Sequence, residues 1–255
     1  MMKALLSMLM VIVILPSLLS AQLIEVDIEE VLGLEILGLE YDSKLKLGEP
    51  FKVGFEVFNS GSVGYRARVR LEIVDEDLYY NSWSKEISLW PGENRYFEVY
   101  SIPMNRTGNF TAKVRIYLAN EIKELNPIKF EVKEITITEK DIQITQFRVY
   151  ENKVDVGISS DQELKNVIIV PSDYPMGWIF EQSKIDELDI NEEKKVELKY
   201  EPTIWKPTEI MIHVFTEDGK HYTNKSFLME REKPFFGTMP NLLKIIRILS
   251  VFFLY

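Results

Sequence analysis

The sequence contains no cysteine. That absence excludes disulfide bonds, zinc–thiolate centres, iron–sulfur clusters and cysteine nucleophiles. Histidine is almost as scarce, because His213 and His221 are the only two among 255 residues. Neither stands near a Gly-x-Ser-x-Gly motif, so a hydrolase triad has no support. We therefore expect a protein that is not an enzyme and that binds no cofactor and no metal.

Basic charge is also in short supply. The chain has 30 Lys and Arg residues against 40 Asp and Glu residues, and its formal net charge is −10. A nucleic-acid-binding surface needs a net basic field or a strong basic stripe, so we expect no nucleic-acid partner. The apolar content of 46% and the charged content of 27% are those of a globular chain.

Helical periodicity is nearly missing between the two ends of the chain, and alternating apolar and polar residues take its place. The pattern runs twice: LWPGENRYFEVYSI in the first half matches LDINEEKKVELKYE in the second. Short strands separated by turn sequences predict an all-β fold of two tandem immunoglobulin-like antiparallel β-sandwiches. We place them at residues 22–135 and 136–233. The expected strands lie at residues 51–59, 65–74, 95–102, 110–119, 128–137, 144–160 (two strands), 164–172, 194–202, 208–216 and 220–230.

A row of arginines lies within the run YRARVRLEIV, residues 65–74. Apolar residues take one phase of the alternation, and Arg66, Arg68 and Arg70 take the other. A sheet with one face packed on the core and the other in solvent produces this alternation without any ligand. We interpret the row as the solvated face of a strand; the alternative is a patch for a ligand or partner.

The N-terminus, MMKALLSMLMVIVILPSLLSAQ, has a basic residue, an apolar run and then small residues. This is the layout of a secretory signal peptide. We predict that residues 1–21 are a signal helix cleaved after Ala21, with an uncleaved signal anchor as the alternative. In both cases the bulk of the chain is exported.

The C-terminal residues 234–255 form an apolar tail. Residues 241–255, NLLKIIRILSVFFLY, are apolar except for four polar residues spaced three apart. Fifteen helical residues span about 22 Å, which is short of the roughly 30 Å bilayer core. We expect a short helix lying in the membrane interface; a truncated anchor and a helix docked on the protein are the alternatives. The predicted location is extracellular and membrane-associated.

Aromatic residues gather in two segments between expected strands, at equivalent places in the two repeats. Aromatic loop residues can bind a glycan or a partner protein, but they also plug the ends of sandwiches, and packing is the favoured interpretation. The candidate binding residues are Tyr79, Tyr80 and Trp83 in the first segment, where Trp90 follows, and Tyr174 and Trp178 in the second.

Three Asn-x-Ser/Thr sequences are candidate glycosylation sites: Asn105, Asn109 and Asn224. All three fall in or beside expected turns or at exposed strand positions, as an exported glycoprotein requires. Asn105 and Asn109 share one loop, so they are the better candidates.

The two histidines flank a predicted hairpin. Asp218-Gly219 is a strong two-residue turn signal, and it pairs His213 with Asn224 and His221 with Thr216. Cross-strand partners share a face and faces alternate along a strand. The histidines therefore point to opposite sides of the sheet and cannot share a metal.

Acidic residues cluster at Asp75-Glu76-Asp77 and at Glu192-Glu193. Calcium favours several hard oxygen ligands, yet neither cluster has the glycine and the regular spacing of a known calcium loop. We interpret both as charged turns that protect strand edges.

Residues 42–133 resemble the CARDB-like class of immunoglobulin-type modules found in prokaryotic, and we expect archaeal, cell-surface proteins. The matching motifs are GEPFKVGFEVFNSGSVG, LWPGENRYFEV and RTGNFTAKVRIY. Residues 136–233 depart from the pattern, because Asn191-Glu192-Glu193 replaces Pro-Gly-Glu. The resemblance implies an extracellular adhesive, spacer or substrate-presenting module, and it implies no catalytic residues.

The leading hypothesis is therefore an exported, non-enzymatic surface module that acts as a spacer, an adhesion element or a protein-interaction element. It predicts no buried titratable cluster and no deep pocket. The alternatives are a module that binds glycans or surface proteins through loop aromatics, and an accessory subunit of a surface enzyme. The enzyme hypothesis needs a cleft lined by paired acids.

Overall fold

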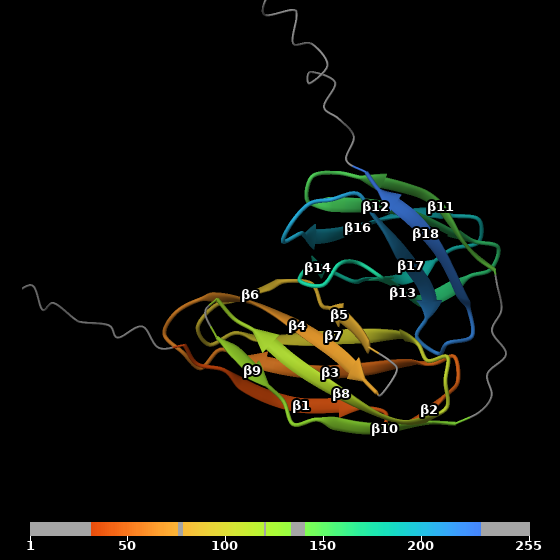
Figure 1. Ribbon diagram of the computed structural model, residues 1–255. Helices are drawn as coiled ribbons and strands as arrows, with labels where there is room; N and C mark the ends of the chain where they lie inside the picture. The colour runs from red at the N-terminus through yellow and green to blue at the C-terminus, as the bar shows by residue number, and fades with distance from the viewer. Residues whose placement is uncertain (1–31, 76–78, 120, 134–140, 231–255) are drawn as a thin grey trace, which may run out of the picture. The chain divides into compact units, whose positions relative to one another are not determined.

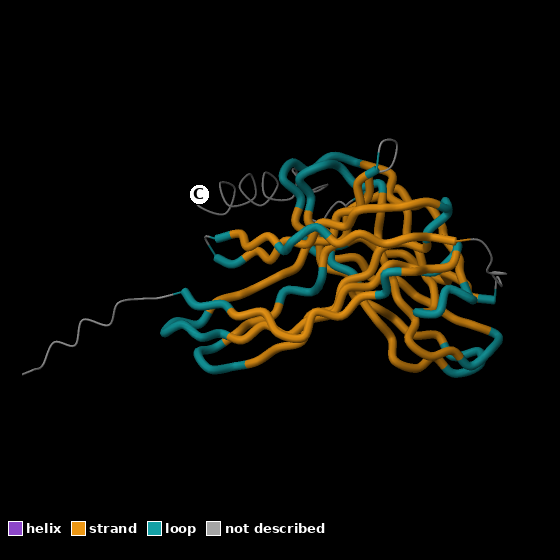
Figure 2. The backbone as a smooth tube through the Cα atoms, turned by 90° about the horizontal axis from the view of Figure 1, so that it is seen from below, coloured by secondary structure: helices purple, strands orange, loops and turns teal. Residues whose placement is uncertain are grey.

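The computed structural model describes residues 32–75, 79–119, 121–133 and 141–230 (Figure 1). Within these stretches all 18 regular elements are β-strands, and Figure 2 shows strands joined only by loops and turns. The expectation of an all-β fold is confirmed. The predicted signal helix and the apolar C-terminal helix fall outside the described residues. None of the described elements is a helix with the length and apolar character to cross a membrane.

The N-terminal half of the fold, residues 35–133, forms two sheets. One has the strand order β1-β3-β7, and the other has the order β2-β10-β8-β4-β5, with β6 paired to β4 and β9 paired to β8. The strands are β1 (Glu35–Tyr41), β2 (Lys44–Lys46), β3 (Pro50–Phe58), β4 (Tyr65–Val74), β5 (Tyr79–Trp83), β6 (Ile87–Leu89), β7 (Asn94–Pro103), β8 (Gly108–Tyr117), β9 (Ile122–Glu124) and β10 (Ile128–Lys133).

One strand pair departs from the expected antiparallel arrangement. The chain leaves the first sheet after β1 and joins the second sheet as β2, which pairs in parallel with β10. Only three residue pairs form, the first being Glu131 with Lys44. A short strand of this kind closes a sheet edge that would otherwise expose unpaired backbone groups.

The C-terminal half, residues 142–229, also forms two sheets, with the strand orders β11-β12-β16-β14 and β15-β13-β17-β18. All its ladders are antiparallel. The strands are β11 (Ile142–Val149), β12 (Lys153–Ser160), β13 (Leu164–Ser172), β14 (Ile179–Phe180), β15 (Ser183–Leu188), β16 (Glu193–Glu201), β17 (Thr208–Thr216) and β18 (Tyr222–Met229). The predicted division at residues 135 and 136 falls among residues 134–140, outside the described part.

Alternation along the strands builds the interior of the N-terminal half. In β8, Phe110, Ala112, Val114 and Ile116 are buried, and the residues between them are partly exposed. These side chains meet Phe55 of β3 and its neighbours in one hydrophobic cluster between the two sheets. Burying one such aliphatic side chain contributes about 1.5–3 kcal/mol, so the period-two pattern accounts for the layered fold.

Strands β13 and β17 are buried on both of their faces. Val167 and Ile169 belong to the hydrophobic cluster inside the C-terminal half. Ile168, Val170 and, on β17, Phe215 belong instead to the cluster of the N-terminal half. All five side chains have no exposed surface. The two halves therefore share a continuous apolar contact, and this contact positions the polar residues beside it.

Candidate functional site at the junction of the two halves

The junction begins where a sheet edge of the N-terminal half meets the C-terminal half. Strand β5 is an edge strand, and its Trp83 forms an isolated parallel bridge with Glu181. The backbone N–H of Gln182 donates a hydrogen bond of 3.0 Å to the carbonyl of Trp83. Residues of the C-terminal half thus pair with backbone groups of β5 that an open sheet edge would leave without partners.

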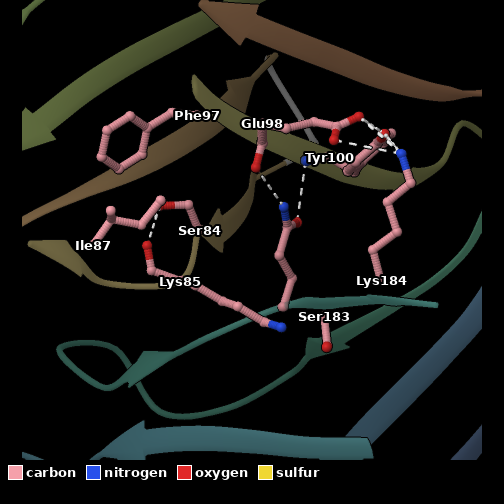
Figure 3. A pocket seen from close by; sticks show the side chains of 9 residues that line it. Ser84, Lys85, Ile87, Phe97, Glu98, Tyr100, Ser183 and Lys184 are labelled. Atoms are coloured by element: carbon pink, nitrogen blue, oxygen red, sulfur yellow. Dashed lines mark hydrogen bonds and ion pairs between the residues drawn. The ribbon is translucent and has the colours of Figure 1, made fainter. Parts of the chain in front are cut away.

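The Gln182 side chain bonds to the backbone of β7 in the N-terminal half. Its Oε1 accepts from the Tyr100 N–H at 3.1 Å, and its Nε2 donates to the Glu98 carbonyl at 3.0 Å (Figure 3). The residue is 6% exposed. Both ends of a buried amide are therefore satisfied across the junction, which makes this residue a specific link between the halves.

Beside it lies a cluster of four charged side chains, which we call the junction cluster: Lys52 and Glu98 from the N-terminal half, and Lys184 and Glu217 from the C-terminal half. Lys52 Nζ lies 2.6 Å from Glu217 and 2.8 Å from Glu98. Lys184 Nζ lies 3.3 Å from Glu98 and 3.6 Å from Glu217. The Tyr100 hydroxyl bonds to Glu98 and lies 3.2 Å from Lys184 Nζ. Each lysine thus contacts carboxylates of both halves.

Electrostatics keep this cluster charged. Burial opposes the charge on Lys52, but hydrogen bonds and attraction from Glu217 and Glu98 outweigh it and raise the pKa of Lys52 above its ordinary value. A general base needs a pKa near the working pH, so Lys52 is suited to pairing and not to proton transfer. The contact between the halves covers these four side chains only in part, since each keeps 20–33% of its surface exposed.

A small cavity of about 160 Å³ adjoins the cluster (Figure 3). Small-molecule sites usually measure about 300–1,000 Å³. The Ser84 hydroxyl in its wall accepts from the Val69 N–H and donates to the Lys85 carbonyl. Glu98 is its one lining carboxylate, whereas the enzyme hypothesis needs a pair. The lining residues are Ser84, Lys85, Ile87, Phe97, Glu98, Tyr100, Gln182, Ser183 and Lys184.

The arginine row differs from its prediction as a solvated face. Arg66 is exposed, but the Arg68 side chain is only 10% exposed and pairs with Glu86 at 2.6 Å and with Glu201 of the C-terminal half at 2.9 Å. The Arg70 guanidinium lies 5.2 Å from the centre of the Trp83 ring. The correction has two causes: Glu201 of the C-terminal half reaches Arg68, and Trp83 of the neighbouring strand β5 lies over Arg70.

The two histidines point to opposite faces, as predicted. The ladder pairs His213 with Asn224, and Thr216 donates its N–H to the His221 carbonyl. His213 is buried on the face that β17 turns to the N-terminal half, and its ring nitrogens contact Ser172 Oγ at 2.8 Å and the Tyr222 hydroxyl at 2.9 Å. Burial lowers the pKa of His213 to about 4.

His221 has a separate environment, where its Nδ1 lies 2.8 Å from a carboxylate oxygen of Asp141. Among the described residues, no group of three or more His, Asp or Glu side chains is arranged to hold a metal ion. Of the predicted acidic turns, Asp75 and Glu193 are exposed and Glu192 is partly exposed. Glu76 and Asp77 lie outside the described residues.

Three of the five predicted loop aromatics lie in a strand, whereas Tyr174 and Trp178 lie in the loop between β13 and β14. Tyr79, Tyr80 and Trp83 lie in strand β5, not in a loop. Tyr80 is buried in the hydrophobic cluster of the N-terminal half, Trp178 in that of the C-terminal half, and Trp83 at the covered edge of β5. Tyr174 is half-buried, and its hydroxyl donates to Asn81 Oδ1 at 2.7 Å. Of the five candidates only Tyr79 is exposed, so they form no open aromatic platform.

Two features escaped the sequence reasoning. The junction had a signal, because Val167 to Val170 are four consecutive apolar residues and such a run indicates a strand buried on both faces. The second feature is the exposure of Trp90: the sequence places this residue after the first aromatic segment, but it does not show that 64% of the residue is exposed just before the turn that precedes β7.

The three candidate glycosylation sites are all exposed. Asn105 lies between β7 and β8, and Asn109 is the second residue of β8. Asn224 lies within β18, where its Nδ2 donates to the Tyr222 hydroxyl at 2.6 Å. Asn105 and Asn109 therefore remain the more accessible pair.

No protein-family model and no curated protein matches this sequence. Over part of its length the chain is similar to the CARDB domain of a Pyrococcus furiosus protein in complex with di-metal ions, at 19% identity and a TM-score of 0.32, covering 42% of this chain and 98% of that one. It is also similar to Pseudomonas fluorescens alkylpurine DNA glycosylase AlkC bound to DNA containing an abasic-site analogue, at 17% identity and a TM-score of 0.33. That match covers 39% of this chain and only 30% of the glycosylase chain. At such TM-scores neither likeness decides the family or the function.

Proposed function

We propose that this chain is an exported, non-enzymatic surface protein in which two tandem immunoglobulin-like sandwiches work as one stiff unit at the outer face of a membrane. Its role is that of a spacer that holds a binding or adhesion surface at a fixed geometry. The observation that carries the proposal is the junction between the halves, with its buried apolar residues, its bridging Gln182 and its junction cluster. The two separate hydrophobic clusters support the division into two sandwiches.

Stiffness follows from what a bending motion would expose. Relative movement is the default for domains with a small polar interface. Here Phe215 and Ile168 of the C-terminal half sit inside the apolar cluster of the N-terminal half. Separating the halves would hydrate both side chains, leave the Gln182 amide without its backbone partners, and break the pairs of Lys52 with Glu217 and of Lys184 with Glu98. A hinge at this place is therefore unfavourable, which suits a spacer.

The charged groups of the junction support a structural role over a catalytic one. The contacts of Lys52 and Lys184 lie within a network of opposite charges. Catalytic groups instead carry pKa values tuned toward the working pH and face a space for substrate. The CARDB-like turn motifs of residues 42–133 agree with an adhesive or spacer module on a cell surface.

The surface location is tested by the fate of the expressed chain. We expect residues 1–21 to direct a fused periplasmic reporter out of the cytoplasm, and we expect the intact mass of the mature protein to start after Ala21. Deleting residues 1–21 should abolish export. A reporter that stays inside the cell with the segment intact would contradict the proposal.

Membrane association is tested separately by liposome flotation of the mature chain with and without residues 234–255. We expect the full chain to float and the shortened chain to remain at the bottom. Equal behaviour of the two chains would contradict a membrane role for this segment. Intact masses would show in the same material whether Asn105 and Asn109 carry glycans when a glycosylating host is used.

A second candidate function is glycan binding. The aromatic residues first considered for it are mostly buried. The exposed indole of Trp90 favours it instead.

A further inference from the structure

A short ladder at one corner of the N-terminal half brings four outward-facing residues together. Strand β6 pairs with the start of β4, with Tyr65 opposite Leu89 and Arg66 opposite Ser88. Tyr65 and Leu89 are buried, so their neighbours on either side point outward. Gly64 and Trp90, one step further along the same register, therefore share the outer face with Arg66 and Ser88.

The indole of Trp90 packs directly against Gly64. A Cβ atom on Gly64 would lie 2.7 Å from Cε3 and 3.0 Å from Cζ3 of that ring. Only glycine leaves room for the ring to lie against the strand. One face of the indole is thus covered by backbone, while 64% of the residue remains exposed. The outward face is a bare, flat apolar surface.

The turn that carries the indole is firmly held. The Trp90 N–H donates to the Glu93 carboxylate at 3.0 Å, and the Glu93 N–H donates to the Trp90 carbonyl at 3.0 Å. Gly92 adopts a φ of 77° and donates its N–H to the carbonyl of the fully buried Asn59 at 2.8 Å. The ring therefore loses little freedom when it binds a ligand.

Hydrogen-bonding groups surround the indole. A cavity of about 350 Å³ lies beside it, lined by Gly64, Tyr65, Arg66, Ser88, Leu89 and Trp90. The Arg66 side chain is 73% exposed and meets Glu86 at 3.3 Å, which leaves most of its five N–H donors available. Ser88 is exposed opposite it. A flat apolar ring with donors at its rim is the combination that this corner offers.

We propose that this corner binds one pyranose ring of a glycan, with the C–H face of the sugar stacked on Trp90 and its hydroxyls bonded to Arg66 and Ser88. A pyranose has an apolar face of C–H groups and a rim of hydroxyls, so it matches both parts of the site. The cavity volume falls in the range of small-ligand sites. An aromatic ring that covers a strand glycine is also a purely structural device, but that role does not require the adjoining cavity or the open guanidinium. The ligand class rests on the proposed surface function, since glycans are the abundant small-ring ligands outside cells.

The test uses the purified protein and five probes: the methyl pyranosides of mannose, glucose and galactose, N-acetylglucosamine, and glucuronate. The readout is the indole N–H resonance of Trp90 in NMR spectra, assigned with Trp90→Phe. We expect at least one probe to move this resonance in a saturable way, with a dissociation constant of roughly 1–10 mM, as for a single small ligand on an open site.

Variants then separate the site from a general effect. Trp90→Ala should abolish sugar binding, measured by saturation transfer from protein to sugar, and Arg66→Ala should weaken it about tenfold. Gly64→Ala keeps the tryptophan, but the added methyl group displaces its ring from the backbone, so this variant should weaken binding as well. Tyr79→Ala, which removes an exposed aromatic elsewhere, is the control and should leave binding unchanged.

The proposal is overturned if none of the five probes moves the Trp90 resonance, or if Trp90→Ala binds a sugar as well as the unaltered protein. An unchanged amide spectrum in each variant shows that the fold is intact. Because the measurement uses purified protein, its result is independent of the export experiments. A sugar-binding chain that stays in the cytoplasm would refute the surface location and leave the site standing.

Discussion

Strand β4 passes through two regions of opposite character. At one end, Gly64 and Arg66 lie in an open corner beside the bare indole of Trp90. A few residues later, Arg68 and Arg70 are withdrawn from solvent at the junction and are held by carboxylates or aromatic rings. All the arginines belong to the same phase of one alternating pattern. The comparison teaches that alternation identifies the side of a strand that faces its own core, but not what covers the other side.

The largest effect is expected in the apolar part of the junction. Phe215→Ala removes a side chain that has no exposed surface and that packs in the cluster of the opposite half. We expect a loss of about 3–5 kcal/mol in the free energy of unfolding, as for other buried aromatic truncations. Urea denaturation followed by fluorescence measures it. A matched substitution of the exposed aromatic, Tyr79→Ala, should cost far less; similar losses would remove the distinction between covered and open regions.

The covered face should also be sensitive to acid. The folded chain keeps His213 neutral down to about pH 4, whereas the unfolded chain binds a proton near pH 6.5. Between these values the unfolded state binds more protons, so stability falls as the pH falls from about 6.5 to about 4, by about 3 kcal/mol in total.

His213→Gln checks this source of the acid sensitivity. The difference in unfolding free energy between the two proteins should change by that amount over the same pH range. Glu181, whose pKa burial raises, contributes with the opposite sign but is present in both proteins. A difference that does not vary with pH would contradict the buried, neutral state of His213.

A smaller contrast lies within the arginine row itself. Arg68→Met removes a nearly buried guanidinium that pairs with Glu86 and Glu201, and Glu86 then loses its closest cation. We expect a loss of about 2 kcal/mol. Arg66→Met should change the unfolding free energy by less than about 0.5 kcal/mol, because that side chain is exposed. Thermal unfolding of the two variants measures both losses of stability. Equal losses would contradict the difference between a covered Arg68 and an exposed Arg66.

The smallest measurable effect is expected in the junction cluster. Lys52→Met leaves Glu98 and Glu217 with only Lys184 as their cation, and a partly exposed ion pair of this kind contributes about 1 kcal/mol. The loss should be smaller in about 1 M salt, because screening weakens the repulsion that remains between Glu98 and Glu217. Lys153→Met, which breaks the exposed pair with Glu197, is the control and should show no detectable change. Equal losses in the two variants would show that the junction cluster does not hold the halves together.

Much of the strand layout could be predicted from the sequence. The strand expected at residues 65–74 is β4 itself, and the one expected at 51–59 is β3 (Pro50–Phe58). In both strands apolar residues alternate with polar ones or glycine over most of the length, and this alternation is the period-two pattern that predicts a strand. The hairpin register that separates the two histidines was predictable for the same reason, since a single turn signal determines every pair that follows.

The junction could not be predicted in this way. Gln182, Lys184 and Glu98 come together only through contacts between segments about 85 residues apart, and no local pattern encodes such a distance. Strand β5 is five residues long and is covered at its edge by the other half. Its tyrosines and its tryptophan therefore resembled loop aromatics. Trp90 differs from them only in what surrounds it, which the sequence does not show.

The central claim is that the two halves behave as one unit, and scanning calorimetry of the full chain tests it most directly. A single unit unfolds in one transition whose calorimetric and van't Hoff enthalpies agree, and we predict that result for this protein. Two resolved transitions, or a calorimetric enthalpy well above the van't Hoff value, would show that the halves unfold separately and would contradict the account.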